Sequence, residues 1–249
     1  MRIAMVGAGY VGLVSGTCFA EFGHDVCVLD TDPAKITALR QGRIPIYEPG
    51  LDRMVEENVA NGHLNFTTDL AEAVSGAEAV FLAVGTPSRR GDGHADLSYV
   101  FAAAEQVARA VTGPTVLVTK STVPVGTGAR LKEIVRRARP QVAIEIASNP
   151  EFLREGSAIG DFMRPDRIVI GTDSEHALEV LRRLYRPLYL IETPIVATAI
   201  ETAELIKYAA NAFLAMKITF INEIADLCEK TGANVHDVAR GIGLDGRIG

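Results

Sequence analysis

The sequence has few cysteines and no long hydrophobic run. It contains three cysteines, Cys18, Cys27 and Cys228, an odd number with no metal-ligand spacing. Each lies in an apolar periodic segment, so we interpret all three as small core residues and expect no metal site. The apolar stretches Ala79–Val84 and Ala209–Ala215 are much shorter than the ~20 residues of a membrane-spanning helix, so we expect no membrane partner.

An excess of positive charge is absent as well. The chain has 25 Lys and Arg against 31 Asp and Glu, a formal net charge of −6. This balance provides no general attraction to nucleic acid. The first residues, Met1–Val6, run directly into a glycine-rich turn and do not resemble a signal peptide. We therefore expect a cytoplasmic protein without a nucleic-acid partner, and its 48% apolar residues are enough for a substantial core.

Short β-rich runs alternate with amphipathic segments in the first part of the chain. The runs expected as strands are Arg2–Val6, Asp25–Leu29, Ala79–Val84, Thr115–Thr119 and Ile144–Ala147. The segments expected as helices are Val11–Phe22, Pro33–Gln41, Leu97–Val111 and Thr127–Ala138. Because such alternation requires crossover connections, the strands should be parallel. We predict an α/β fold with a Rossmann-like, doubly wound, mostly parallel sheet.

The pattern changes in the second half of the chain. One more strand is expected at Arg167–Gly171 and a helix at Glu175–Leu184, followed by a turn-rich connector at Pro187–Pro194. From about Ala199 the chain is expected to be helical, with apolar residues all round the helix. Such a helix is typical of burial against a partner subunit.

The predicted division is one domain over residues 1–197 and a central helical domain over residues 198–249. Gly241–Gly249 is rich in glycine and is expected to form a loop with no element after it. A natural polypeptide seldom stops in such a loop, so we expect the chain to be a piece of a longer protein.

A glycine-rich turn follows the first expected strand. Gly7-Ala8-Gly9-Tyr10-Val11-Gly12 also opens a helix, which is the context in which a G-x-G-x-x-G motif predicts a dinucleotide site. Gly7 would allow the tight turn, Gly9 the approach of the pyrophosphate, and Gly12 the close packing of helix against strand. The helix start, at Tyr10 and Val11, would offer free N–H groups to the phosphates.

An acidic residue stands at the end of the second expected strand. Asp30 could accept hydrogen bonds from both adenosine ribose hydroxyls and would repel a 2′-phosphate, which favours NAD over NADP. Lys35 could touch the ribose region or be a solvated helix lysine, and the residues alone favour the solvated lysine. The glycine turn could also be a tight turn without a ligand. We favour the cofactor because strand, glycines, helix and terminal acid coincide.

Two threonines follow later strands. Thr86 comes after Ala79–Val84, and Thr122 comes after Thr115–Thr119. Ligands of open α/β sheets bind beyond the carboxyl ends of the strands, so both are candidate cofactor contacts. Threonine at a strand end is more often only a turn or cap residue.

Two further motifs go beyond a generic dinucleotide domain, Asn149–Gly156 and Lys207–Asn211. If Glu151–Glu155 forms a helical turn, its two carboxylates share one face, as Lys207 and Asn211 do on their helix. A lysine on a largely apolar helix is costly to bury unless it is paired, which makes Lys207 a candidate site residue. The alternative is a surface lysine that extends its amine to water.

Taken in order, these motifs resemble the UDP-glucose/GDP-mannose dehydrogenase family along essentially the whole chain. The matching motifs are Gly7–Gly12, Gly85-Thr86-Pro87, Ser121-Thr122-Val123-Pro124-Val125-Gly126-Thr127, Asn149–Gly156, Lys207–Asn211 and Ile221-Asn222-Glu223. Within the family, Glu155–Ile159 and Arg164–Arg167 look more like UDP-glucose than GDP-mannose dehydrogenases. The resemblance implies an oxidoreductase of nucleotide-sugar metabolism and polysaccharide biosynthesis that uses NAD.

The family oxidises the C6 alcohol of a sugar to a carboxylate in two NAD-dependent steps. The intermediate aldehyde is held on a cysteine, first as a thiohemiacetal and then as a thioester. The resemblance therefore implies a UDP-sugar as substrate, with UDP-glucose oxidised to UDP-glucuronate. GDP-mannose or another nucleotide sugar is the alternative. A homodimer formed through the central helix is expected on the same ground.

Roles for individual residues also follow from the resemblance. With the resemblance, Lys35 is expected to contact the ribose region of the cofactor. Thr122 would orient a catalytic water near the cofactor, Glu151 would serve in thioester hydrolysis, and Glu155 would contact the cofactor or water. Lys207 would stabilise the developing oxyanion, and Asn211 would hydrogen-bond the reacting oxygen, roles that suit an alkoxide-like transition state. The residues expected to line the sugar nucleotide are Glu151, Phe152, Leu153, Arg154, Glu155, Lys207 and Asn211.

The sequence departs from the family in one respect. The family nucleophile lies in a Gly-Gly-x-Cys-x-Pro-Lys-Asp motif after a segment like Asp245–Gly249, and none of the three cysteines has that context. We therefore expect a chain that lacks the nucleophile and the C-terminal UDP-binding domain. Such a chain could bind NAD but not complete the thioester chemistry.

Two alternatives remain open at this point. The 3-hydroxyacid dehydrogenases and 6-phosphogluconate dehydrogenase also combine a Rossmann domain with a Lys-x-x-x-Asn pair, but they lack the Ser-Thr-Val-Pro-Val-Gly and Asn-Pro-Glu-Phe-Leu-Arg motifs. A non-catalytic NAD-binding module is the alternative of a different class. It would bind NAD without any turnover.

Overall fold

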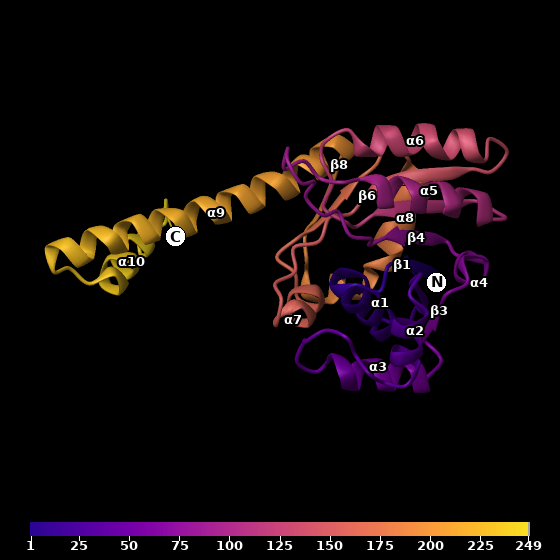
Figure 1. Ribbon diagram of the computed structural model, residues 1–249, viewed down its shortest axis with the longest axis horizontal. Coiled ribbons are helices and arrows are strands. Elements are labelled where there is room, and N and C mark those ends of the chain that lie inside the picture. The colour runs from indigo at the N-terminus through magenta and orange to yellow at the C-terminus, as the bar shows by residue number, and fades with distance from the viewer. Residues whose placement is uncertain (249) are drawn as a thin grey trace. The chain divides into compact units, whose positions relative to one another are not determined.

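The computed structural model describes residues 1–248, and its largest feature is an eight-stranded sheet with helices on both faces (Figure 1). The strands lie in the order β3-β2-β1-β4-β5-β6-β7-β8. Neighbouring strands pair parallel except β6 and β7, which meet antiparallel at Ser148 and Gly171. The predicted α/β class, with a Rossmann-like and mostly parallel sheet, is confirmed.

The strands of the sheet are short, and one helix is much longer than the others. The strands are β1 (Arg2–Val6), β2 (Asp25–Leu29), β3 (Leu64–Thr67), β4 (Ala79–Leu82), β5 (Thr115–Thr119), β6 (Ile144–Ser148), β7 (Ile168–Gly171) and β8 (Ile195–Thr198). The helices are α1 (Tyr10–Glu21), α2 (Pro33–Arg40), α3 (Leu51–Ala60), α4 (Leu70–Val74), α5 (Ser98–Ala110), α6 (Thr127–Ala138), α7 (Ala158–Met163), α8 (Glu175–Leu184), the 3-10 helix η1 (Arg186–Ile191), α9 (Ile200–Thr231) and α10 (Val235–Gly243).

Both faces of the sheet are buried. Side chains alternate between the faces along a strand, so Ile3 and Met5 of β1 belong to one core cluster and Ala4 and Val6 to the other. The first cluster includes residues of α1, α3 and α8, and the second includes residues of α5 and α6. Figure 1 shows α5 and α6 on one side of the sheet and α1 on the other. This arrangement explains why the strands read as continuous apolar runs.

Most expected elements of the first 200 residues are present, but five escaped the sequence analysis: α3, β3, α4, α7 and β8. The 3-10 helix η1 lies where a turn-rich connector was expected. Strand β3 contains only four residues, one of them the exposed Asn65. It forms at the sheet edge because it pairs with β2, from Val26–Leu64 to Leu29–Thr67. Such a pairing depends on tertiary contact, so its local sequence signal is weak.

Two local predictions were wrong. Glu151–Glu155 does not form a helical turn, because residues 151–154 have no regular structure and a turn begins only at Glu155. The stretch from Gly241 onward is not all loop, since α10 continues to Gly243. The Asn234 side chain accepts from His236 N and so starts this helix. Gly249, the last residue of that prediction, lies outside the described residues.

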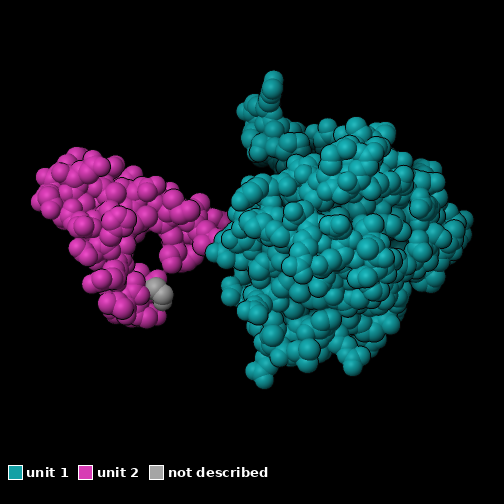
Figure 2. Space-filling view, turned by 90° about the horizontal axis from the view of Figure 1, so that it is seen from below, with its two compact units in different colours: residues 1–205 teal, residues 206–249 magenta. Residues whose placement is uncertain are grey.

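The chain divides into two compact units, residues 1–205 and residues 206–249, coloured teal and magenta in Figure 2. The first unit holds the sheet and the first turns of α9, and the second holds the remainder of α9 and α10. The predicted boundary at residues 197 and 198 stays a prediction. The long helix expected from about Ala199 begins at Ile200.

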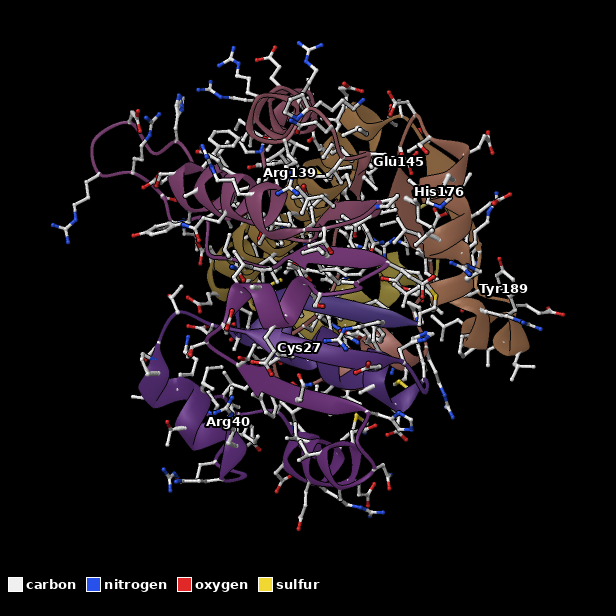
Figure 3. The ribbon with its side chains drawn as sticks, turned by 90° about the vertical axis from the view of Figure 1, so that its right-hand side faces the viewer. Cys27, Arg40, Arg139, Glu145, His176 and Tyr189 are labelled. Atoms are coloured by element: carbon white, nitrogen blue, oxygen red, sulfur yellow. The ribbon has the colours of Figure 1, made fainter. Side chains whose placement is uncertain are left out.

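Side-chain contacts tie the outer helices of the first unit to its strands. Arg40 Nε donates to Phe66 O (2.9 Å), which links the end of α2 to β3. Glu145 of β6 and His176 of α8 lie beside each other, with 2.7 Å between Oε2 and Nδ1 (Figure 3). All three cysteines are buried, as expected of core residues.

Candidate functional site

The glycine turn after β1 adopts a conformation that requires two of its glycines. Gly7 has φ +107°, and a Cβ on it would lie 2.6 Å from Ala83 O. A Cβ on Gly12 would lie 1.9 Å from Gly7 O. Around Gly9, in contrast, there is nothing within 4 Å of an ideal Cβ. The turn is therefore closed against β4 at Gly7 and Gly12 and open at Gly9, where a ligand backbone could approach.

The N-terminus of α1 points its amides out of this turn. The first hydrogen bond of the helix runs from Leu13 N to Gly9 O (2.9 Å). The N–H groups of Tyr10 and Val11 precede it and lie at the positive end of the helix dipole. Gly9 is the N-cap and no side chain caps the helix. The helix start thus presents the donors that a phosphate group would use.

Asp30 lies at the carboxyl end of β2, next to the same turn. Its Oδ2 accepts from Ala8 N (2.9 Å) and Lys35 Nζ (2.8 Å), and its Oδ1 accepts from Asp32 N (3.0 Å). Burial alone would raise the pKa of Asp30, but the bonds from Lys35, Asp32 N and Ala8 N hold that pKa below its usual value. The carboxylate is therefore ionised, as an acceptor of ribose hydroxyls should be.

Lys35 is not the solvated lysine that the residues alone favoured. Its ammonium forms an ion pair with Asp30, and the two side chains are 29% and 12% exposed. Helix α2 starts at Pro33, directly after Asp32, so Lys35 lies in the first helical turn and close to Asp30. Lys35 therefore lies next to the position expected of the adenosine ribose. An open glycine turn, free helix amides and an ionised acid fit a dinucleotide.

The ends of β4 and β5 converge, as expected of neighbouring parallel strands. Thr86 Oγ1 donates to Thr122 O (3.0 Å), and Ser121 Oγ donates to Val84 O (2.6 Å). Thr86 and Thr122 are partly buried. Both threonines thus lie at the carboxyl edge of the sheet that carries the glycine turn, while Thr86 also serves as a link between strand ends.

A buried polar cluster supports the loop after β6. Tyr185 Oη donates to Asn149 Oδ1 (2.6 Å), and Lys120 Nζ lies 3.1 Å from the same oxygen. Asn149 Nδ2 donates to Val169 O (2.9 Å). Burial raises the pKa of Tyr185, so its hydroxyl stays protonated. The cluster fixes the residue at which the Asn149–Gly156 motif begins.

The residues of that motif point in different directions. Glu151 Oε2 accepts from Leu153 N (2.6 Å), which holds the loop in a local turn. The Arg167 guanidinium stacks 3.7 Å from the centre of the Phe152 ring. Arg154 pairs with Asp161 (2.6 Å), which lowers the pKa of that carboxyl. Glu155 is exposed. Glu151 and Glu155 therefore do not share a helix face.

Lys207 and Asn211 lie four residues apart on the continuous helix α9, so they share a face as predicted. Lys207 is buried and Asn211 is exposed. Glu204 lies one turn earlier and is also buried, and its carboxylate accepts from Gly126 N (2.7 Å) and Gly128 N (2.8 Å). Burial raises the pKa of Glu204 although these bonds oppose the shift.

Sequence reasoning missed two buried carboxylates, Glu48 and Glu204. Glu48 accepts from Tyr10 Oη, Gly156 N (2.9 Å) and Ile159 N (3.2 Å). A carboxylate three residues before Lys207 on an apolar helix was a usable signal for Glu204, because both belong to one helix face. Glu48 lies in a loop between two prolines and had no comparable signal.

A cavity of about 610 Å³ is lined by Met1, His24, Arg186, Tyr189 and other residues. Because Met1 and His24 immediately precede β1 and β2, it lies at the amino ends of the strands, away from the glycine turn. Over residues 1–248 no helix is long and apolar enough to cross a membrane. The same residues contain no group of three or more potential metal ligands.

Two family domains match the chain. Residues 1–189 match the NAD binding domain of the UDP-glucose/GDP-mannose dehydrogenase family, and residues 201–249 match the central domain of that family. The first match covers the glycine turn, Asp30 and the loop after β6. An NAD-binding domain agrees with the geometry described above.

Individual relatives point the same way. The chain is 67% identical, over its full length, to UDP-glucose 6-dehydrogenase of Rhizobium meliloti (strain 1021), of which it covers 57%. A UDP-glucose dehydrogenase structure from Pyrobaculum islandicum is 43% identical, with a TM-score of 0.94 over 100% of this chain and 57% of that one. A GDP-mannose dehydrogenase structure from Pseudomonas aeruginosa is 34% identical, with a TM-score of 0.94 over 98% and 57%. The chain thus spans little more than half the length of these relatives.

Proposed function

Because the chain belongs to the UDP-glucose/GDP-mannose dehydrogenase family, we propose that it forms the cofactor-binding part of an enzyme that oxidises UDP-glucose to UDP-glucuronate. The proposal rests on the arrangement of groups at the carboxyl edge of the sheet. There the open turn at Gly9, the ionised Asp30 and the linked pair Thr86 and Thr122 lie on adjacent strand ends. The sugar nucleotide is chosen from the names of the relatives, which favour UDP-glucose over GDP-mannose.

On the cofactor side, NAD would accept the hydride released from C6 of the sugar. The amides of Tyr10 and Val11 would bind the pyrophosphate, and Gly9 would leave room for it. Asp30 would accept from the ribose hydroxyls, with Lys35 holding its carboxylate in place. Repulsion between Asp30 and a 2′-phosphate would exclude NADP.

On the substrate side, the loop after β6 and helix α9 would supply the reacting groups. Thr122 would position a water near the cofactor, and Glu151 would act as the base in hydrolysis. The buried Lys207 would stabilise an oxyanion at C6, and Asn211 would donate to the reacting oxygen. Phe152, Leu153, Arg154 and Glu155 would line the sugar nucleotide, with Glu155 also close to the cofactor or a water.

Two cysteines of this chain, Cys18 and Cys27, are poor nucleophiles. Burial raises the pKa of Cys18 and Cys27 to about 12, and Cys228 is also buried. A thiolate is the nucleophilic form of cysteine, so a buried neutral thiol would not capture an aldehyde. We therefore propose that this chain alone binds NAD but does not carry the oxidation through to the carboxylate.

Assembly and location are part of the same proposal. Phe213, Leu214, Met216, Ile218 and Phe220 are exposed apolar residues of α9. Their number on one helix supports a homodimer formed through the central helix. The cytoplasmic location, the role in polysaccharide biosynthesis and the division at residues 197 and 198 stay predictions.

The proposal is tested by single-turnover NADH formation, measured by absorbance, for this chain and for the full-length product of its gene. Each protein is supplied with NAD and either UDP-glucose or GDP-mannose. We expect two NADH per UDP-glucose from the full-length product. This chain should form no more than one, from the alcohol-to-aldehyde step, which does not need the cysteine. Turnover of GDP-mannose alone would mean that GDP-mannose, and not UDP-glucose, is the substrate. Binding of NAD without turnover by either protein would favour a non-catalytic module.

A further inference from the structure

The carboxylate of Glu48 connects two segments that are distant in the sequence. Glu48 lies in the loop before α3 and is 7% exposed. Its Oε2 accepts from Tyr10 Oη and from Gly156 N (2.9 Å), and its Oε1 accepts from Ile159 N (3.2 Å). Tyr10 opens the helix after the glycine turn, whereas Gly156 ends the loop after β6.

The contacts form a closed network. Gly156 N donates both to Glu48 and to Tyr10 Oη, the second at 2.9 Å. Burial, and then the hydrogen bond to Glu48, raise the pKa of Tyr10 to about 12, so its hydroxyl remains a donor. A buried carboxylate is costly unless several donors satisfy it. These donors come from two places, the start of α1 and the segment Gly156–Ile159.

Beside the network, helix α7 packs against α1, the helix that follows the glycine turn. Helix α7 begins two residues after Gly156, and its Phe162 ring packs edge-on against Phe19 of α1 at 5.0 Å. Figure 1 shows α1 and α7 side by side. Ser157, the N-cap of α7, makes no side-chain cap bond, so Glu48 supplies an acceptor there through Ile159 N.

We propose that Glu48 is a positioning residue that holds the loop after β6 against the cofactor end of α1. This inference rests on the proposed function, in which α1 binds the pyrophosphate and the loop lines the sugar nucleotide. A cofactor that immobilises the start of α1 would also immobilise Gly156 and its neighbours, because Tyr10 Oη and Glu48 bind Gly156 N. The cofactor would then preorganise the sugar site before the sugar arrives.

The alternative is that Glu48 only stabilises the fold, as a remote cap of α7. The two roles differ in what the cofactor does. A cap would slow exchange of the α7 amides equally with and without NADH. A positioning residue makes protection of the loop depend on the cofactor, and that dependence requires both Glu48 and the Tyr10 hydroxyl.

The test is amide hydrogen exchange of this chain with and without NADH, together with NADH affinity from its fluorescence. The variants are Glu48→Gln and Tyr10→Phe, with Glu56→Gln as the matched control. Glu56 is exposed on α3, so the control makes the same chemical change outside the network. Tyr10→Phe keeps the backbone donors of Glu48 and removes only the link to α1, which guards against misfolding of Glu48→Gln.

In the unsubstituted chain we expect NADH to slow exchange in peptides covering residues 153–160. Without NADH, Glu48→Gln should speed this exchange about tenfold because a charge-assisted acceptor is lost. Peptides of β1 and β5 should not change. Both variants should lose the protection by NADH, and NADH should bind about threefold to tenfold more weakly to Glu48→Gln. Glu56→Gln should match the unsubstituted chain.

The proposal is overturned if exchange rises equally in β1 and β5, or if NADH still protects the loop in both variants. An unsubstituted chain that does not bind NADH at all is a separate result. It removes the proposed function and the cofactor dependence with it. Exchange without NADH would then show only whether Glu48 holds the loop.

Discussion

The two units of the chain differ in how far they bury their apolar side chains. In the first unit, strands β4 and β5 are buried at every position, between helices on both faces of the sheet. In the second unit, Phe213, Leu214 and Phe220 are between 53% and 58% exposed. The first unit therefore buries its central strands completely, whereas the second leaves a large apolar surface on α9 exposed.

This difference separates two sources of stability. A sheet covered on both faces gains most of its stability from burial within one chain. A long helix with apolar residues all round needs a second surface, and a partner subunit can supply it. We expect substitutions in the first unit to change the free energy of unfolding, and substitutions in the second to change association.

The largest effect is expected at Gly12. In Gly12→Ala the new Cβ would meet Gly7 O at 1.9 Å, and we expect a loss of about 3 kcal/mol in the free energy of unfolding. Gly241→Ala, inside α10 of the second unit and with nothing within 4 Å, should be neutral or slightly stabilising. Urea unfolding followed by circular dichroism measures both. Equal effects would mean that the turn is not closely packed.

The next effect is expected at the buried cluster behind the loop after β6. Tyr185→Phe removes the hydroxyl that donates to Asn149 Oδ1 (2.6 Å). Asn149 Oδ1 keeps Lys120 Nζ as a donor at 3.1 Å. The variant therefore loses one buried hydrogen bond, which costs about 1 kcal/mol, and the denaturation midpoint should fall. Tyr189→Phe is the control, because Tyr189 is 49% exposed and lies on the outside of η1 (Figure 3). It should change stability by less than about 0.5 kcal/mol.

A substitution in the second unit tests the other half of the comparison. Phe220→Glu places a charge on the exposed apolar face of α9. We expect the proposed dimer to dissociate at least about tenfold more readily, since each copy would lose a large apolar side chain from the proposed interface. Sedimentation velocity over a range of concentrations measures this, with Glu229→Gln as control. A monomer for the unsubstituted chain at every concentration would contradict the homodimer.

The smallest effect is expected from pH at Asp30. The folded pKa of Asp30 is lowered, so its carboxylate stabilises the fold above the unfolded pKa, and this contribution disappears as pH falls through the folded pKa. Asp30→Asn should therefore be less stable than the unsubstituted chain by about 1 kcal/mol near neutral pH. The difference should vanish in acid. A constant difference across the titration would show that the charge of Asp30 contributes nothing.

The sequence was a good guide where the chemistry is local. The glycine spacing, the strand before it and the acid at the next strand end lie within 30 residues, and their geometry agrees with the prediction. The faces of α9 followed from helical periodicity, which places Lys207 and Asn211 together. Contacts between residues far apart in the sequence could not be predicted in this way. Glu48 and Gly156 are 108 residues apart, and no local pattern joins them.

Where local preference was weak, the prediction failed. Glu151–Glu155 was expected to turn as a helix, but Glu151 bonds to Leu153 N and the segment stays irregular. For Lys35 the residues without the resemblance favoured a solvated side chain, whereas its ammonium pairs with Asp30. In both cases one side-chain hydrogen bond decided the outcome, and its energy exceeds the small difference between local conformations.

Periodicity and glycine spacing in the sequence were sufficient for the fold class, the dinucleotide turn and the long helix, because each depends on the geometry of a few consecutive residues. Three features depended on the tertiary structure: the edge strand β3, the bonds of Glu48 and Glu204 to distant backbone amides, and the cluster of Lys120, Asn149 and Tyr185. A buried polar group must find a partner wherever the chain brings one. That partner is chosen by the packing of distant segments, and a linear pattern does not record it.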